Sequence, residues 1–226
     1  MTALPGKAAY QAVLFDLDGT LLDTAPDFVT AINRMVRESG REIMDPALIR
    51  AGVTNGSAGL ITLAFGLSPT DEEFEPLRQR FLTYYAACLT EHTRLFPGLD
   101  DVLTKLDAHG IPWGVVTNKP ALYTFAILDN LPLPSRPGAV VCPDHVTHTK
   151  PHPEPVLLAC SQLAVAPEHT LFVGDHLRDI ESGHNAGCAT VSAAWGYIDA
   201  DEDPAAWGAH FLIEHASELD GILFSR

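Results

Sequence analysis

The chain has 226 residues, of which 46% are apolar and 19% are charged, so we expect a folded globular protein rather than a disordered one. The net charge of −15, with only 14 Lys and Arg, argues against nucleic acid or an anionic membrane as a partner. No apolar stretch reaches the roughly 18 residues of a membrane span, and residues 1–7 contain no apolar segment typical of a secretory signal.

The cysteines are widely spaced and form no CxxC pair. This pattern predicts small buried thiols in a reducing compartment, which indicates a cytoplasmic protein. These residues are Cys88, Cys142, Cys160 and Cys188.

Apolar runs typical of buried strands alternate with segments of helical periodicity along most of the chain. This alternation predicts an α/β fold with a doubly wound, Rossmann-like parallel sheet that is covered on both faces. Because such sheets bind ligands at the carboxyl ends of their strands, the polar residues after each run are candidate site residues. The strand-like runs lie at 11–16, 111–117, 139–142, 170–175 and 189–193, and helices are expected at 98–109 and 153–164.

Between about residues 24 and 92 the alternation stops, and only helical periodicity is present. Since irregular excursions of this length are uncommon, the segment predicts a small α-helical cap inserted after the first strand. We therefore expect a core of residues 1–22 and 93–226 and a cap of residues 23–92. The apolar faces of its helices contain Phe28, Ile32, Met35 and Val36, then Leu60, Ile61, Ala64 and Phe65, then Phe74, Leu77, Phe81, Tyr84 and Cys88.

Asp16 and Asp18 directly follow the first apolar run. Two acids at the end of a buried strand are unfavourable unless a cation or hydrogen bonds compensate them. Placed two residues apart, one can attack a substrate while the other moves protons, with a divalent metal holding the charges together. The alternative is a strand end followed by an ordinary acidic turn.

Four motifs along the chain resemble those of the haloacid dehalogenase-like hydrolases, in the order and at the spacing typical of that family. Residues 15–24, FDLDGTLLDT, resemble its first motif, and residues 115–119, VVTNK, resemble the second. Lys150, followed by PHPEP, resembles the third motif, and residues 172–179, FVGDHLRD, resemble the fourth.

The resemblance implies a role for each motif residue. Asp16 is the expected nucleophile, which forms an aspartyl-phosphate that water then cleaves. Asp18 is the expected general acid and base, and its presence favours phosphate chemistry over dehalogenation. Thr117 and the backbone N–H of Asn118 are expected to bind the phosphoryl oxygens, and Lys150 to contact Asp16 or the phosphoryl group.

The resemblance also implies Mg²⁺ as cofactor, bound by Asp16, Asp175 and the backbone carbonyl of Asp18. Asp179 is expected to orient a metal-bound water, with pairing to Arg178 or capping of a local turn as the alternative.

Five further residues near these motifs have other interpretations. His176 stands where members of the family often have Ser, Thr or Asp. Lys119 is expected on the surface. His145, His148 and His152 are interpreted as a flap beside Lys150 rather than as a transition-metal site.

The cap is expected to determine the substrate. It contains no lysine between Asp23 and Lys105, which disfavours the phosphonoacetaldehyde hydrolase branch of the family. Residues 50–59 resemble the specificity loop of phosphoglycolate phosphatase-like proteins, where Arg50 and Asn55 are the expected polar contacts. An ordinary interhelical loop is the alternative.

Longer runs resemble a subgroup, the N-acetylmuramic acid 6-phosphate phosphatases, at residues 113–120, 141–147, 174–183 and 196–198. The predicted function is a Mg²⁺-dependent phosphatase acting on a small phosphate monoester, either N-acetylmuramic acid 6-phosphate or 2-phosphoglycolate. A β-phosphoglucomutase-like phosphotransferase and a phospho-aspartate signalling module are the alternatives. The sequence leaves open whether the protein is a monomer or a homodimer.

Overall fold

The computed structural model describes residues 10–199 and 201–224. The segment 1–7, in which no secretory signal is expected, lies outside them. Among the described residues no helix has both the length and the apolar character needed to cross a bilayer. The four cysteines are all buried and free.

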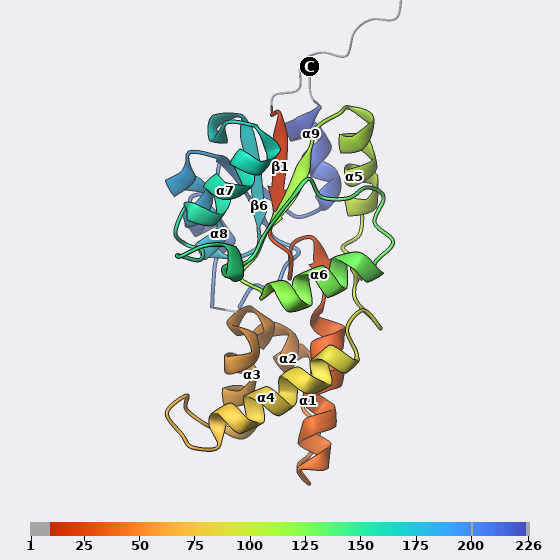
Figure 1. The fold of residues 1–226 in the computed structure, drawn as a ribbon, viewed down its shortest axis with the longest axis vertical. Helices are drawn as coiled ribbons and strands as arrows, with labels where there is room; N and C mark the ends of the chain where they lie inside the picture. The colour runs from red at the N-terminus through yellow and green to blue at the C-terminus, as the bar shows by residue number, and fades with distance from the viewer. Residues whose placement is uncertain (1–9, 200, 225–226) are drawn as a thin grey trace, which may run out of the picture.

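A six-stranded parallel sheet forms the centre of the core, in the order β5-β4-β1-β6-β7-β8 (Figure 1). The predicted α/β fold with a parallel sheet is thereby confirmed. β8 is absent from the predicted set because it has three residues, of which only Ile213 is buried, so no apolar run marks it. The strands are β1 (Ala12–Phe15), β4 (Trp113–Val116), β5 (Ala139–Val141), β6 (Thr170–Gly174), β7 (Ala189–Ala193) and β8 (Phe211–Ile213).

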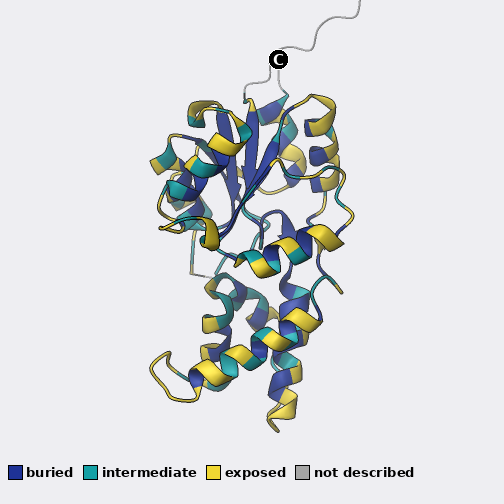
Figure 2. Cartoon of the chain, in the orientation of Figure 1, coloured by how far each residue is buried: buried dark blue, intermediate teal, exposed yellow. Residues whose placement is uncertain are grey.

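Helices cover both faces of this sheet, and the interiors of β1, β4, β6 and β7 are buried (Figure 2). Val13 and Phe15 of β1 pack into a core with the apolar face of α5, whereas Leu14 between them packs into a second core with α7. This opposition follows from the two-residue period of a strand. The core helices are α5 (Leu99–Ala108), α6 (Ala121–Asn130), α7 (Glu154–Leu163), α8 (Leu177–Ala186) and α9 (Leu219–Leu223), with 3₁₀ turns η1 (Val53–Asn55), η2 (Pro143–His145), η3 (Pro167–His169), η4 (Pro204–Trp207) and η5 (Ala216–Glu218).

The helical insertion after β1 lies beyond the carboxyl ends of the strands (Figure 1). Phe28 of α1 stacks on Tyr85 of α4 with ring centroids 4.1 Å apart, and Phe81 joins them. The predicted apolar face of α4 contains Tyr84, but it is the next residue, Tyr85, that the structure buries completely, while Tyr84 is half-buried. The insertion consists of α1 (Ala25–Glu38), α2 (Pro46–Gly52), α3 (Gly56–Phe65) and α4 (Phe74–Ala87).

The chain enters and leaves the insertion through a two-stranded antiparallel ribbon. β2 (Leu22–Asp23) pairs with β3 (Arg94–Leu95), so the two connections between cap and core run side by side. The exact division of core and cap at residues 23 and 92 stays a prediction.

Beside this ribbon, the buried carboxylate of Asp27 binds the segment that returns from the cap. Its Oδ1 accepts a hydrogen bond from the backbone N–H of His92 at 2.8 Å. Its Oδ2 accepts from the N–H of Thr90 at 3.0 Å and from the N–H and Oγ1 of Thr93 at 3.1 and 2.6 Å. Four donors therefore satisfy a carboxylate that burial would otherwise penalise.

Candidate active site

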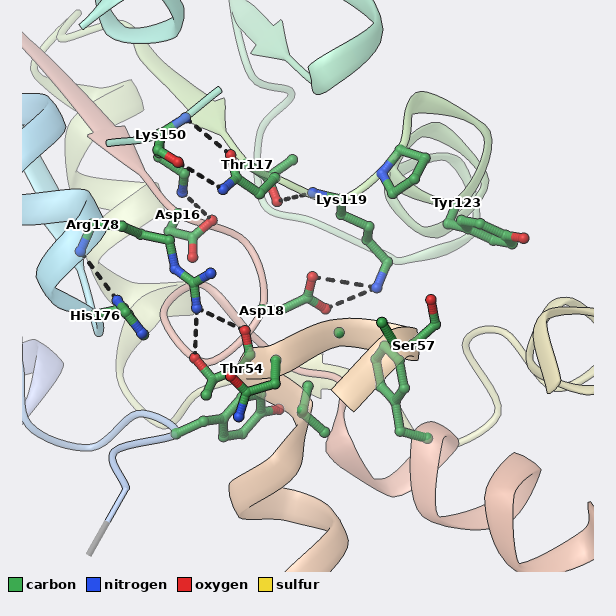
Figure 3. Close-up of a pocket in the computed structure, with 18 of the residues that line it drawn as sticks. Asp16, Asp18, Thr54, Ser57, Thr117, Lys119, Tyr123, Lys150, His176 and Arg178 are labelled. Carbon is green, nitrogen blue, oxygen red and sulfur yellow. Dashed lines mark hydrogen bonds and ion pairs between the residues drawn. The ribbon is translucent and has the colours of Figure 1, made fainter. Parts of the chain in front are cut away.

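The carboxyl ends of β1, β4 and β6 are neighbours in the sheet, and the polar residues that follow them meet under the cap. They line a cavity of about 390 Å³ between core and cap (Figure 3). This is the crevice that open α/β sheets form where the strand order reverses. Seven of the predicted site residues line this cavity: Asp16, Asp18, Asn55, Thr117, Asn118, Lys150 and Asp175.

Lys150 is the buried cation of the site. Its Nζ lies 2.8 Å from Asp16 Oδ1 and 2.7 Å from Asp179 Oδ1, and it donates to the carbonyl of Val116 at 2.8 Å. Burial opposes the charge of this ammonium group, but the carboxylates of Asp16 and Asp179 outweigh that effect and raise its pKa. Lys150 therefore stays charged and holds the Asp16 side chain in place.

The loop after β4 supports Lys150 from the other side. The Asn118 side chain donates to the carbonyl of Lys150 at 3.1 Å and accepts from its N–H at 3.2 Å. Thr117 Oγ1 accepts from the N–H of Lys119 at 3.1 Å, which leaves the hydroxyl proton of Thr117 available for a ligand. The Asn118 side chain thus fixes the backbone of Lys150, whereas the backbone N–H of Asn118 remains available to an oxyanion.

Asp16, Asp175 and Asp179 form a compact acidic cluster, with ligand oxygens within 4.8 Å of one another. Burial and the neighbouring carboxylates raise the pKa of Asp175 to about 8. Burial likewise raises the pKa of Asp16 to about 6, although Lys150 opposes the shift. Asp175 is held by Thr20 Oγ1 at 2.7 Å and by the N–H of Tyr197 at 2.8 Å.

The charge of this cluster fits a divalent cation. When all three carboxylates are ionised, the single ammonium of Lys150 balances one of their charges and leaves two negative charges to be compensated. Mg²⁺ prefers a site with few carboxylates and with room for water and phosphate oxygens. Gly19 keeps that space open: its φ is +87°, and a Cβ there would lie 2.0 Å from Asp175 Oδ2.

Asp18 is not part of this cluster, because its carboxylate points to Lys119. Lys119 Nζ lies 3.0 Å from Asp18 Oδ1 and donates to the hydroxyl of Tyr85 at 2.8 Å, while Thr24 Oγ1 donates to Asp18 Oδ1 at 2.5 Å. The expectation that Lys119 lies on the surface is wrong: its side chain is 6% exposed. It also lies 4.7 Å above the ring of Phe28, so the cap covers it.

The two cap residues predicted to contact the substrate, Asn55 and Arg50, lie in different places. Asn55 lines the cavity, but Arg50 does not. Arg50 Nη1 pairs with Asp23 Oδ1 at 2.7 Å, and its guanidinium lies 4.7 Å above the ring of Tyr197, whose hydroxyl donates to Asp23 at 2.7 Å. Arg50 thus links the cap to the ribbon and to the core beside the cavity.

Asp179 caps a local turn, which is one of the alternatives expected for it, and it also pairs with Lys150; its role toward a metal-bound water stays a prediction. Its Oδ2 accepts from the N–H of His176 at 3.2 Å and caps α8, while its Oδ1 meets Lys150 in the acidic cluster. Arg178 does not pair with it. Instead, Arg178 Nη2 crosses to the cap and donates to the carbonyl and Oγ1 of Thr54 at 2.7 and 2.9 Å.

His176 and Arg178 both line the cavity, a position that the sequence analysis does not give them. His176 Nδ1 accepts from the N–H of Arg178 at 3.1 Å. Burial and the charge of Arg178 lower the pKa of His176 to about 4, so this imidazole is neutral at pH 7. No local pattern marks these residues, because their partners come from the cap and from the folded loop.

The three histidines before α7 divide into two arrangements. His145 Nδ1 accepts from the N–H of Cys142 at 3.1 Å and closes a local turn. His148, His152 and Glu154 have potential ligand atoms within 4.8 Å of one another. Glu154 also accepts from the N–H of Thr147 and His148, at 2.8 and 2.9 Å, so the cluster has a structural role at the start of α7.

Comparison with known proteins agrees with this geometry. The family model described as haloacid dehalogenase-like hydrolase matches residues 13–193. The chain belongs to the haloacid dehalogenase-like hydrolases. Among the members of this family, an N-acetylmuramic acid 6-phosphate phosphatase of Pseudomonas aeruginosa is 46% identical over 94% of this chain and 94% of its own.

Two further relatives extend the comparison. A phosphoglycolate phosphatase of Xanthomonas campestris is 39% identical over 92% of this chain and 94% of its own. A crystal structure of a predicted phosphoglycolate phosphatase from Haemophilus somnus superimposes with a TM-score of 0.84 at 28% identity, covering 96% of this chain and 99% of that one. The predicted family, and with it the core with an inserted helical cap, is confirmed.

Proposed function

We propose that this haloacid dehalogenase-like phosphatase hydrolyses the 6-phosphate of N-acetylmuramic acid or of a closely related acidic sugar. The size of the cavity is the observation that favours a sugar. Its volume of about 390 Å³ lies within the range of ~300–1,000 Å³ that accommodates drug-sized ligands. The two-carbon acid 2-phosphoglycolate would leave most of this space to water, so it is the second candidate.

In the first half-reaction, Asp16 attacks phosphorus in line and the alcohol leaves on the opposite side. Lys150, at 2.8 Å, keeps the Asp16 carboxylate oriented for that attack. The Thr117 hydroxyl and the N–H of Asn118 are the donors for the phosphoryl oxygens as charge spreads over them. Asp18 donates a proton to the departing alkoxide and afterwards removes one from the water that cleaves the aspartyl-phosphate.

Asp16, Asp175 and the backbone carbonyl of Asp18 would hold Mg²⁺, with Asp179 beside them. When bound, Mg²⁺ supplies positive charge that brings the phosphoryl oxygens and the attacking carboxylate together. Lys119 and Thr24 hold the Asp18 carboxylate away from the acidic cluster, so that Asp18 would contribute its backbone carbonyl rather than its side chain to the metal site. Four buried thiols without disulfides support a reducing, cytoplasmic setting for this chemistry.

A β-phosphoglucomutase-like phosphotransferase would use the same residues but would protect the phospho-enzyme from water until a sugar phosphate binds again. Turnover with release of inorganic phosphate separates the two reactions.

The test is phosphate release at fixed Mg²⁺ from N-acetylmuramic acid 6-phosphate and from 2-phosphoglycolate, with the Asp16→Asn protein as blank. We expect kcat/KM for the sugar to exceed that for the two-carbon acid by on the order of a hundredfold, or about 2.7 kcal/mol of differential transition-state binding. A preference for 2-phosphoglycolate would reverse the assignment, and release from neither would refute it.

A further inference from the structure

Four basic side chains line the cavity, and three of them have a carboxylate partner. Lys150 pairs with two acids of the cluster and Lys119 pairs with Asp18. Arg78 on α4 forms a bidentate pair with Glu75, with both nitrogen–oxygen distances 2.8 Å. The charge of these three cations is therefore already balanced within the protein.

Arg178 is the exception. No carboxylate of the described residues lies within ion-pair distance of it, and its side chain donates through Nη2 to the two neutral oxygens of Thr54. A guanidinium carries five N–H donors, so Nε and Nη1 still offer three of them in the cavity. In a chain with a net charge of −15, an unbalanced guanidinium inside a cavity is a site for an anion.

The position of Arg178 decides which part of a substrate it meets. It extends from the start of α8 to Thr54 of the cap loop, so its guanidinium spans the space between core and cap (Figure 3). In-line attack by Asp16 directs the leaving group away from the sheet and toward the cap. Arg178 therefore faces the leaving alcohol, whereas Lys150, Thr117 and Asn118 face the phosphoryl group.

We propose that Arg178 is the specificity residue that binds a carboxylate on the leaving group of the substrate. The inference rests on the proposed function and deepens it. N-acetylmuramic acid carries a carboxylate on its lactyl ether, and 2-phosphoglycolate carries one as well, whereas N-acetylglucosamine 6-phosphate has the same sugar ring without it. Planar, bidentate pairing with a carboxylate is the interaction for which a guanidinium is suited.

The test compares N-acetylmuramic acid 6-phosphate with N-acetylglucosamine 6-phosphate in four proteins: wild type, Arg178→Gln, Arg178→Lys and Arg78→Gln. Arg178→Gln should lower kcat/KM for the acidic sugar by on the order of 10- to 100-fold, the range of a charge-assisted hydrogen bond. Its kcat/KM for the neutral sugar should change less than about threefold. Arg178→Lys should restore part of the preference, and Arg78→Gln should keep it.

Three outcomes would overturn the inference. An equal loss for both sugars in Arg178→Gln would make Arg178 a phosphoryl contact or a cap support. An unchanged preference would remove Arg178 from recognition. If only Arg78→Gln lost the preference for the acidic sugar, Arg78 on α4 rather than Arg178 would bind the carboxylate.

A binding measurement keeps this inference separate from the proposed function. If wild-type protein hydrolyses neither sugar phosphate, the proposed function fails. The carboxylate site is then judged in the Asp16→Asn protein by calorimetric titration with 2-phosphoglycolate and with ethyl phosphate. Adding Arg178→Gln should weaken binding of 2-phosphoglycolate only; equal weakening, or none, refutes the site.

Discussion

The two sides of the cavity are built differently. The side that we call the floor consists of Asp16, Thr117, Lys150 and Asp175, which follow strands of the central sheet or lie against them. The side that we call the roof is the cap loop of residues 53–58. Lys150 has three polar contacts and Asp175 has two, and Lys150 in turn holds the Asp16 carboxylate at 2.8 Å.

In the roof, Thr54 is held to the core by the two hydrogen bonds from Arg178, whereas the side chains of Asn55 and Ser57 are held weakly or not at all. Asn55 is exposed, and its side chain has no partner among the described residues. Ser57 accepts one long bond of 3.3 Å from Arg78. A fixed floor suits a reaction that is the same for every phosphate ester, and an adaptable roof suits recognition of the part that differs. The four predictions below test this division, beginning with the largest effect.

The strongest test of the floor is Asp16→Asn. Because the amide cannot form the aspartyl-phosphate, kcat should fall by at least about four orders of magnitude for every substrate. Phosphate release from two unrelated esters measures this, and the melting temperature serves as the control for folding. Residual turnover that depends on the ester would mean that Asp16 is not the nucleophile.

Asp18→Ala separates proton transfer from attack. Loss of a general acid should lower kcat by about 10²–10⁴-fold for a sugar phosphate, whose alkoxide leaves poorly. Hydrolysis of p-nitrophenyl phosphate should suffer far less, because its leaving group needs no proton. Equal losses for the two esters would contradict the role of Asp18 as the acid.

Lys119→Met tests the core side chain that joins Asp18 to Tyr85 and Phe28 of the cap helices. Methionine keeps the contact with the ring of Phe28 but loses the ion pair with Asp18 and the bond to Tyr85. We expect kcat/KM to fall about tenfold, or about 1.4 kcal/mol, with a larger effect on poor leaving groups. Arg80→Met, which breaks an exposed pair with Glu38 away from the cavity, is the matched control and should leave the rate unchanged.

The last test leaves catalysis aside and concerns the stability of the floor. The pKa values of Asp16 and Asp175 are raised to about 6 and about 8, above the value near 3.9 of the unfolded chain. The folded state therefore retains protons that the unfolded state loses, so without metal the free energy of unfolding should fall as pH rises from about 4 to about 8.

Mg²⁺ should compensate the ionised floor, and it should therefore raise the melting temperature more at pH 8 than at pH 5.5. At a hundredfold excess over Kd the gain is about 2.7 kcal/mol, which corresponds to roughly 5–10 °C for a chain of this length. Thermal melts with Mg²⁺ and with EDTA at both pH values measure this. If Mg²⁺ raised the melting temperature more at pH 5.5 than at pH 8, the ionised Asp16 and Asp175 would not be the source of the charge that Mg²⁺ compensates.

The floor could be predicted from the sequence because each of its residues stands beside a local signal. Asp16 and Asp175 follow apolar runs, and Lys150 precedes a proline-rich helix start. Lys119 and Arg178 also stand near such signals, but the signals do not indicate where these two side chains point. Their surroundings depend on Tyr85 and Thr54, which lie far away in the chain, so only the folded cap shows that one is buried and that the other reaches into the cavity.

Short elements escaped prediction for a related reason. α2 has seven residues of which only Ile49 is buried, so it has no apolar period, although Asp45 and Pro46 form a recognisable helix start.

On α4, Tyr84 and Tyr85 both fit an apolar face within the resolution of a 3.6-residue period. Tyr85 is the buried one of the two because its ring stacks on Phe28 and its hydroxyl accepts a hydrogen bond from Lys119.

Asp27 also bears on how the chain reaches this structure. By binding the backbone at 90–93, it brings together two points that are more than sixty residues apart, and β2 and β3 continue this pairing into the core. The entropy of closing that long loop is thus offset within the insertion itself. β1 precedes the insertion and β4 follows it, and these two strands pair in the parallel sheet. Because the ends of the insertion are held together, it separates β1 and β4 no more than a short hairpin would. We therefore expect the length of the insertion to affect the assembly of the catalytic core less than an unpaired loop of the same length would.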